Sequence, residues 1–189
     1  LSYSRRINRP EFWQLNPFGG LSDTRNLTIG NPELDPTYTH SFEFALLKKW
    51  TKFTLTPSVY YARTKNYFQY VLKQTDEGNF LRTPVNLAYE ERYGLELSST
   101  YNPFNWWRLA LNFNYYGFKQ QGEFEGKQYA TDDQTWTTQL NSRMKLPKNL
   151  AIESIFSYRG KFQDIQSLNK ATYRLNVALS KDIWKEKMT

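Results

Sequence analysis

The sequence contains no cysteine and only one histidine, His40. Without cysteine the chain forms no disulfide, and it has no thiolate for a metal site or for nucleophilic catalysis. It also lacks a long apolar run: a helix that spans a bilayer needs about 20 mostly apolar residues, and no stretch approaches that length. Disulfide scaffolds, thiolate metal sites and helical membrane proteins are therefore excluded as classes.

Recognisable catalytic constellations are missing as well. A lone His40 cannot build a multi-histidine metal site, and no nucleophile-elbow or glycine-rich phosphate motif is present. Glu90 and Glu91 are adjacent, but neighbours in a strand face opposite ways, so the two carboxylates cannot act together. We therefore expect no enzyme, no cofactor and no metal site, and we interpret His40 as an interface or lumen residue.

Aromatic residues are abundant, with 14 Tyr, 13 Phe and 6 Trp, and the formal net charge is +7. A basic, aromatic chain is compatible with anionic lipid or with nucleic acid as a partner. Stacking on nucleic acid needs aromatic and basic side chains on one exposed face. Here the aromatics share a face with Leu and Val while the basic residues lie on the other, so we expect no nucleic-acid partner.

A strict two-residue alternation dominates the chain. In 107–115 every odd position is apolar, whereas most even positions are polar. Because successive side chains of a strand point to opposite faces, such a segment has one apolar and one polar face. The same pattern predicts strands at 1–7, 38–49, 52–65, 86–101, 105–117, 134–146, 150–160 and 169–181.

The connections between these strands alternate in length. Short turns fall at 49–51, 102–104 and 147–149, and long polar links fall at 8–37, 66–85, 118–133 and 161–168. Residues 67–72 and 79–84 are expected to continue their strands as a protruding hairpin. We call the two ends of the sheet the turn end and the loop end. Short turns at one end of the sheet and long loops at the other are typical of outer-membrane barrels.

Aromatic residues gather at both ends, as in the girdles of transmembrane barrels. At the turn end they are Trp50, Phe104, Trp106, Trp107 and Trp184, and at the loop end Tyr60, Tyr61, Tyr67, Tyr115, Tyr116 and Tyr158. The predicted fold is all-β: an antiparallel up-and-down meander of about eight strands that forms part of a transmembrane outer-membrane β-barrel. Its low mean hydropathy of −0.75 is compatible with this fold, since only every second residue of a barrel strand meets lipid.

Two stretches add specificity to the periodic pattern. Residues 3–18 contain paired arginines followed by Arg-Pro, Phe-Trp and Asn-Pro-Phe, and residues 30–36 read Gly-Asn-Pro-Glu-Leu-Asp-Pro. Together they resemble a signature in the C-terminal barrel region of TonB-dependent receptors, specifically the outer membrane protein β-barrel family. Thr37 stands near a position where that family often has Glu.

The resemblance implies a barrel of about 22 strands in the outer membrane of a Gram-negative bacterium, filled by an N-terminal plug. It implies transport of a scarce small solute, such as a siderophore, cobalamin, glycan or peptide, driven by the TonB energy-transducing complex acting through the plug. The partners expected are thus outer-membrane lipid, the protein's own plug domain and the TonB complex. We expect residues 1–189 to be a single β-barrel segment, a fragment without the plug and without the remaining strands.

Position in this scheme suggests two sets of site residues. The loop residues expected to contact a ligand are Arg9, Trp13, Tyr67, Phe68, Tyr70 and Phe124. The charged residues expected to face the lumen or plug are Arg92, Glu96, Arg108, Arg143, Glu153 and Arg174. Two alternatives remain beside the transporter: a passive porin or adhesion barrel, and a soluble antiparallel β-sheet binding module.

The absence of cysteine permits a direct test of the membrane wall. Single cysteines placed at 107 through 115 and spin-labelled in the complete barrel should be accessible to oxygen at odd positions and to a polar reagent at even ones, because odd residues face lipid. Odd positions shielded from both reagents would indicate a soluble core and overturn the membrane interpretation.

Overall fold

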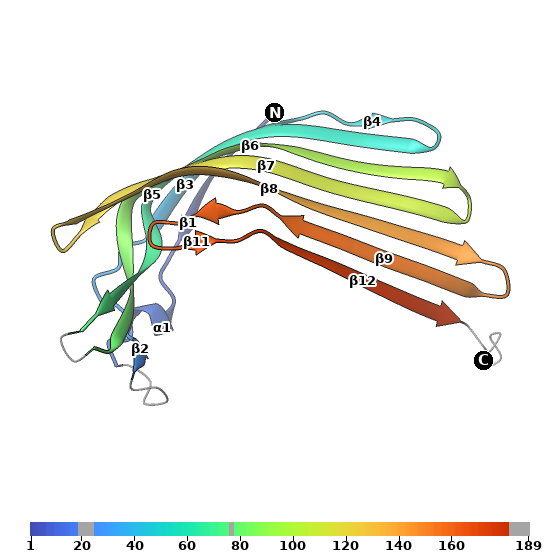
Figure 1. Cartoon of the computed structure of the whole chain (residues 1–189). Coiled ribbons are helices and arrows are strands. Elements are labelled where there is room, and N and C mark those ends of the chain that lie inside the picture. The colour runs from blue at the N-terminus through green and yellow to red at the C-terminus, as the bar shows by residue number, and fades with distance from the viewer. Residues whose placement is uncertain (19–24, 76–77, 182–189) are drawn as a thin grey trace, which may run out of the picture.

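The computed structural model describes residues 1–18, 25–75 and 78–181, and in it the chain forms one large, curved, open antiparallel sheet (Figure 1). Its main strands follow in the order β1-β3-β5-β6-β7-β8-β9-β12. Their bounds are Ser2–Asn8 (β1), Thr37–Ala45 (β3), Phe53–Gln74 (β5), Phe80–Phe104 (β6), Trp107–Phe124 (β7), Lys127–Leu146 (β8), Leu150–Arg159 (β9) and Thr172–Lys181 (β12). The predicted up-and-down meander is confirmed.

One short helix and several short strands accompany the main strands. The helix α1 spans Phe12–Leu15, and β2 (Asn26–Thr28) pairs in parallel with the start of β6. The short strand β4 (Lys48–Lys49) continues β3 along β5. The strands β10 (Phe162–Gln163) and β11 (Leu168–Asn169) pair with each other between β9 and β12. In the described residues no helix is long and apolar enough to cross a membrane, an observation that concerns helices alone.

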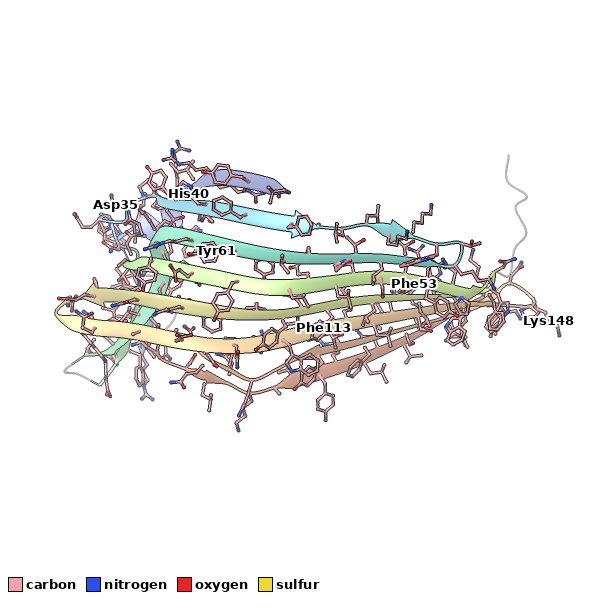
Figure 2. The ribbon with its side chains drawn as sticks, turned by 90° about the horizontal axis from the view of Figure 1, so that it is seen from above. Asp35, His40, Phe53, Tyr61, Phe113 and Lys148 are labelled. Carbon is pink, nitrogen blue, oxygen red and sulfur yellow. The ribbon has the colours of Figure 1, made fainter. Side chains whose placement is uncertain are left out.

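Cross-strand register gathers the apolar side chains on the convex face. Leu111 of β7 lies opposite Leu140 of β8, which lies opposite Phe156 of β9, and that residue lies opposite Leu175 of β12. Figure 2 looks onto this face, where Phe53, Tyr61 and Phe113 lie along the strands. The alternation in the sequence thus becomes a continuous apolar surface on one side of the sheet.

A row of aromatic residues bounds that surface at the loop end. Its members are successive cross-strand partners: Tyr3, Phe42, Tyr61 and Tyr93. At the turn end Trp50 stacks on Phe53 at 5.5 Å, and Phe104 stacks on Trp106 at 5.4 Å between ring centroids. From Phe53 to Tyr61 the strand covers about 26 Å, similar to the roughly 25 Å apolar band of such barrels before tilt is included.

Three of the expected girdle residues are not on the convex face: Tyr67 is half-buried beside Glu90, and two others lie on the concave side. Tyr60 and Tyr116 sit at even positions, which face the concave side, and Tyr60 donates a hydrogen bond to Asn114 Oδ1 at 3.3 Å. A run of two tyrosines in a strand can place only one of them toward lipid. Trp184, predicted for the turn end, lies outside the described residues.

The polar segment 118–133, predicted as a loop, is a hairpin instead. β7 and β8 pair as far as Phe124 and Lys127, joined by a two-residue turn at Glu125 (φ 49°) and Gly126 (φ 73°). Positive φ at both central residues is the geometry of the type I′ hairpin turn. The prediction was wrong because both faces of this segment carry polar residues, which hides the strand period. The hairpin expected around 66–85 is confirmed, with β5 and β6 paired from 67–74 to 80–87.

The buried core lies at the loop end and not in the middle of the sheet. Val71, Val85, Leu87 and Tyr129 form it, with Phe124 and Ile165 packed against it. The β5–β6 hairpin bends toward the concave side (Figure 1) at Asn66, whose φ is 53° and which is skipped in the strand register. We call the hairpin beyond this residue the bent hairpin.

Gly122 permits the close contact between the bent hairpin and β7. A Cβ at this glycine would lie 2.7 Å from the Leu87 Cα and 2.8 Å from the Ala88 amide nitrogen. Backbone atoms cannot move aside as a flexible side chain does, so a methyl group here must push the two strands apart.

Gly122→Ala should therefore loosen the bent hairpin, at a cost of about 1–3 kcal/mol. The expected result is roughly ten- to hundredfold faster amide hydrogen exchange in 80–88, with exchange in 107–115 unchanged. Lys119→Ala, at an exposed position of the same strand, serves as the control. Equal protection of 80–88 in both variants would show that the contact at Gly122 does not hold the hairpin.

Candidate ligand-binding site at the loop end

The two sequence motifs of the N-terminal region dock on each other through their backbones. The Gly30 amide donates to Asn16 O at 2.9 Å, and the Asn31 amide donates to Gln14 O at 2.7 Å. A Cβ at Gly30 would lie 2.5 Å from Asn16 O, so only glycine fits this approach. The residues that carry the family resemblance thus form one structural unit, although about 15 positions separate them in the sequence.

A capping box holds α1 within this unit. The Glu11 side chain accepts a hydrogen bond from the backbone of Gln14, and the Gln14 side chain accepts one from the Glu11 amide at 2.8 Å. Glu11 also accepts a hydrogen bond from Trp13 Nε1. The reciprocal pairing of Glu11 and Gln14 satisfies free amides at the start of the helix. The bond from Trp13 Nε1 to Glu11 fixes the direction of the Trp13 ring.

Two asparagines attach the unit to the bent hairpin. Asn31 Nδ2 donates to Pro84 O at 3.2 Å. The Asn86 side chain accepts from the Asp35 amide at 2.8 Å and donates to Asp35 O at 3.0 Å and to Asn66 O at 2.7 Å. One amide side chain therefore satisfies backbone groups of the motif and of the bend at the same time.

An exposed aromatic and cationic patch results from this attachment. The Trp13 ring stacks on Tyr70 with centroids 6.3 Å apart and planes 5° apart, and the Arg82 guanidinium lies 4.0 Å from the centroid of the Tyr70 ring. We call Trp13, Tyr70 and Arg82 the Trp13 patch. Stacked rings and a guanidinium bind planar or anionic groups, and 53% of the Trp13 surface is exposed.

The link between β9 and β12 fixes the free edge of the bent hairpin. The Gln166 side chain accepts from the Leu72 amide at 2.8 Å and donates to Leu72 O at 3.2 Å, as a neighbouring strand would. Gln69 donates to Asp164 at 3.2 Å, and Lys73 forms an ion pair with Glu125. The bent hairpin is thus held from three sides, which makes the Trp13 patch a fixed surface.

A polar cluster forms around the buried Glu90. Glu90 accepts a hydrogen bond from Gln120 Nε2 at 2.7 Å and lies 3.5 Å from an Arg92 guanidinium nitrogen, which in turn lies near the Tyr116 ring. Burial, and then the nearby Glu90 carboxylate, raise the pKa of the Tyr67 phenol above its usual value. Tyr67 therefore stays neutral throughout the physiological range of pH.

The structure brings together only some of the predicted contact residues. Trp13 and Tyr70 meet in the Trp13 patch, whereas Tyr67 faces the polar cluster and Phe124 packs against the buried core. Phe68 is half-buried, and Arg9 is exposed. Arg82 was missed, because an arginine in a predicted hairpin carries no signal of its own until the fold places it on Tyr70. A role of these residues in ligand binding stays a prediction.

The six charged residues expected to face the lumen share the concave side by register. Arg108 and Arg143 are direct cross-strand partners, and Arg143 also lies opposite Glu153. Arg92 joins the polar cluster around Glu90. Glu96 lines a groove on this side of the sheet, and Arg174 lies opposite Ser157 of β9. Contact with water or with a plug stays a prediction.

Within residues 1–18, 25–75 and 78–181 there is no group of three or more His, Asp or Glu side chains arranged to hold a metal ion. The chemistry available at the loop end is thus that of ring faces, guanidinium groups and amides. Such groups recognise a ligand by stacking and hydrogen bonding.

Comparison with known proteins defines the class. The sequence profile of the outer membrane protein beta-barrel family matches residues 1–189, so the chain belongs to this family. The predicted resemblance and the localisation in a Gram-negative outer membrane are thereby confirmed. No curated protein matches the sequence.

The fold is shared with a solved outer-membrane receptor. The siderophore receptor PirA from Pseudomonas aeruginosa is similar with a TM-score of 0.52 at 14% identity, covering 93% of this chain and 38% of the receptor. The copper transporter OprC gives a TM-score of 0.47 at 11% identity, covering 82% of this chain and 30% of the transporter. The chain thus spans less than half of either protein.

Asn86 binds both Asp35 of the motif and Asn66 of the bend, so its removal should affect the site. Asn86→Ala leaves Asp35 O and Asn66 O without their partner, which should cost about 1–3 kcal/mol and free the motif from the hairpin. With 5-fluorotryptophan in the complete protein, the Trp13 ¹⁹F resonance, assigned with Trp13→Phe, should move toward its value in unfolded protein. Asn105→Ala, an exposed change at the turn end, is the control. An unmoved resonance in Asn86→Ala would contradict the anchoring role.

Proposed function

We propose that this chain is part of the barrel of a TonB-dependent outer-membrane receptor, which binds a scarce solute at its extracellular loops and imports it. Membership of the outer-membrane barrel family supports the location, and the fold is shared with a siderophore receptor. The observation that carries the binding step is the Trp13 patch: an exposed, prearranged surface at the loop end, held by the residues of the family motif.

Preorganisation is the physical reason why this patch suits binding. A surface whose side chains are already ordered loses little conformational entropy when a ligand arrives. Trp13 is fixed by Glu11, and Tyr70 is fixed by the pairing of β5 with β6 and by the stack itself. A solute with a ring or an anionic group would meet both the aromatic faces and the Arg82 guanidinium.

The concave face supports a plug as the second partner. A groove of about 550 Å³ at the turn end is lined by Lys52, Arg108, Arg143 and Lys145 together with Trp106. Among the described residues none of these four cations forms an ion pair with an acidic side chain. Like charges placed directly opposite each other destabilise a sheet unless an anion lies between them. We infer that acidic side chains of a plug domain fill this role, and that the TonB complex acts through that plug.

The binding step is tested in the complete receptor that contains this chain. Isothermal titration with a ferric siderophore, cobalamin, an oligosaccharide and a small peptide should identify one solute that binds. Trp13→Ala and Arg82→Gln should each weaken its binding about tenfold or more, as expected for an aromatic or arginine contact at the centre of a site. Trp106→Ala, which removes a tryptophan at the turn end, should leave the affinity unchanged.

Transport is tested separately in whole cells. Uptake of the solute identified in this way should stop when a protonophore removes the energy source, because TonB-dependent import is driven from the inner membrane. Uptake that continues at the same rate would refute energised transport and favour a passive porin. Binding and uptake that are both unchanged in Trp13→Ala and Arg82→Gln would refute the assignment of the patch.

A further inference from the structure

A row of ionisable residues crosses the convex face just beyond the aromatic row at the loop end. Its members are successive cross-strand partners: Arg5, His40, Arg63, Glu91, Lys119 and Asp132. In an outer-membrane barrel the aromatic row lies at the water–lipid interface. The ionisable row therefore lies at the level of the lipid head groups of the outer leaflet, facing the membrane and not the lumen.

A groove of about 490 Å³ lies at one end of this row, across β1, β3 and β5. It is lined by Tyr3, His40, Phe42, Tyr61, Arg63 and Lys65. The Tyr3 and Phe42 rings pack at 5.0 Å between centroids, and the Tyr3 hydroxyl is hydrogen-bonded to His40 Nδ1 at 2.8 Å. The groove thus has an aromatic part toward the membrane and nitrogen-bearing side chains toward the loops; His40 and Tyr61 are labelled there in Figure 2.

The charge at this groove is not balanced within the described part of the chain. Arg63 lies 3.4 Å from Glu91, but this carboxylate also accepts a hydrogen bond from the Tyr61 hydroxyl at 3.1 Å. Neither Arg5 nor Lys65 has an acidic partner among the described residues. Arg5 instead lies over the Tyr38 ring at 5.7 Å. The exposed Arg5 and Lys65 and the partly neutralised Arg63 therefore lie around the aromatic side chains of the groove.

We propose that this groove binds a phosphate-bearing acyl lipid of the outer leaflet. An acyl chain lies along the Phe42 and Tyr61 rings, and the phosphate contacts Arg63 and Lys65, with Arg5 close by. The inference rests on charge complementarity at a face that meets lipid, since cations at a membrane interface gain from anionic head groups. It depends on the outer-membrane location of the family and not on the solute that the receptor carries.

The test uses the complete protein in detergent and two lipids that differ only in charge. Native mass spectrometry should show binding of bis-phosphorylated hexaacyl lipid A, and markedly weaker binding of the same lipid without phosphates. The double variant Arg63→Gln/Lys65→Gln should weaken binding of the phosphorylated lipid about tenfold, because it removes two charge-assisted contacts at a partly exposed site. Lys48→Gln/Lys49→Gln, which removes two charges at the turn end, is the matched control and should bind like the wild type.

Other outcomes overturn the proposal. Equal binding by the double variant and the wild type would show that Arg63 and Lys65 do not contact the phosphate. Equal binding of both lipids would show that the groove holds lipid through apolar contacts alone. Competition by millimolar inorganic phosphate would indicate a free-anion site. Wild-type protein that ignores the lipid but dimerises through this face, with the dimer lost in the double variant, would assign the groove to a second copy. If the double variant fails to assemble, Lys65→Gln alone should weaken binding about threefold, and an unchanged affinity there overturns the proposal equally.

Discussion

The alternation of side chains along paired strands determines which residues of this protein can meet. Once the register is fixed, each side chain points to one face of the sheet, and the residues directly opposite it on the neighbouring strands point to the same face. Along β7 the positions that carry the apolar or buried residues change from odd to even near Gly117. Before it the odd residues are apolar and convex, whereas after it Phe118, Gln120 and Gly122 are buried on the even side and Lys119 is exposed. Lipid selects the first arrangement, and packing against the bent hairpin selects the second.

The loop end is consequently a small folded core of its own, built on top of a membrane wall. Three backbone adjustments make it possible: positive φ at Asn66, and the close approaches at Gly30 and Gly122. Hydrogen bonds from Asn86 and Gln166 then replace the strand partners that the bent hairpin gave up when it left the sheet. The same contacts that satisfy these backbone groups also hold the Trp13 patch, so the stability of this end and the geometry of the patch depend on one set of interactions.

Charge is distributed over the two faces in a way that fits two different partners. The concave side places Arg108 beside Arg143 at the turn end, and the convex side places Arg5, Arg63 and Lys65 at the loop end. Both groups lack enough acidic partners in the described residues. A barrel separates these surfaces completely, since one meets the lumen and the other meets lipid. We propose an acidic plug surface as the anion on the lumen side and a lipid phosphate as the anion on the membrane side.

The class of this protein can be predicted from the sequence alone. The period of two in 107–115 marks a strand with one apolar face, and the alternating lengths of the connections and the aromatic residues at both ends favour a membrane barrel over a soluble sheet. The short turns, the hairpin around 66–85 and the family can be predicted as well, since Pro fixes the backbone locally and Gly and Asn allow conformations that other residues avoid. The prediction failed for 118–133, where the buried face is formed by residues such as Gln120 and Gly122 that carry no apolar signal. Three features become visible only in the folded chain: the contact of Trp13, Tyr70 and Arg82, the inward orientation of Tyr67 and Phe124, and the row shared by Arg5, His40 and Arg63. These contacts join positions far apart in the sequence, and their partners are set by register and by the bend at Asn66, which no local pattern encodes.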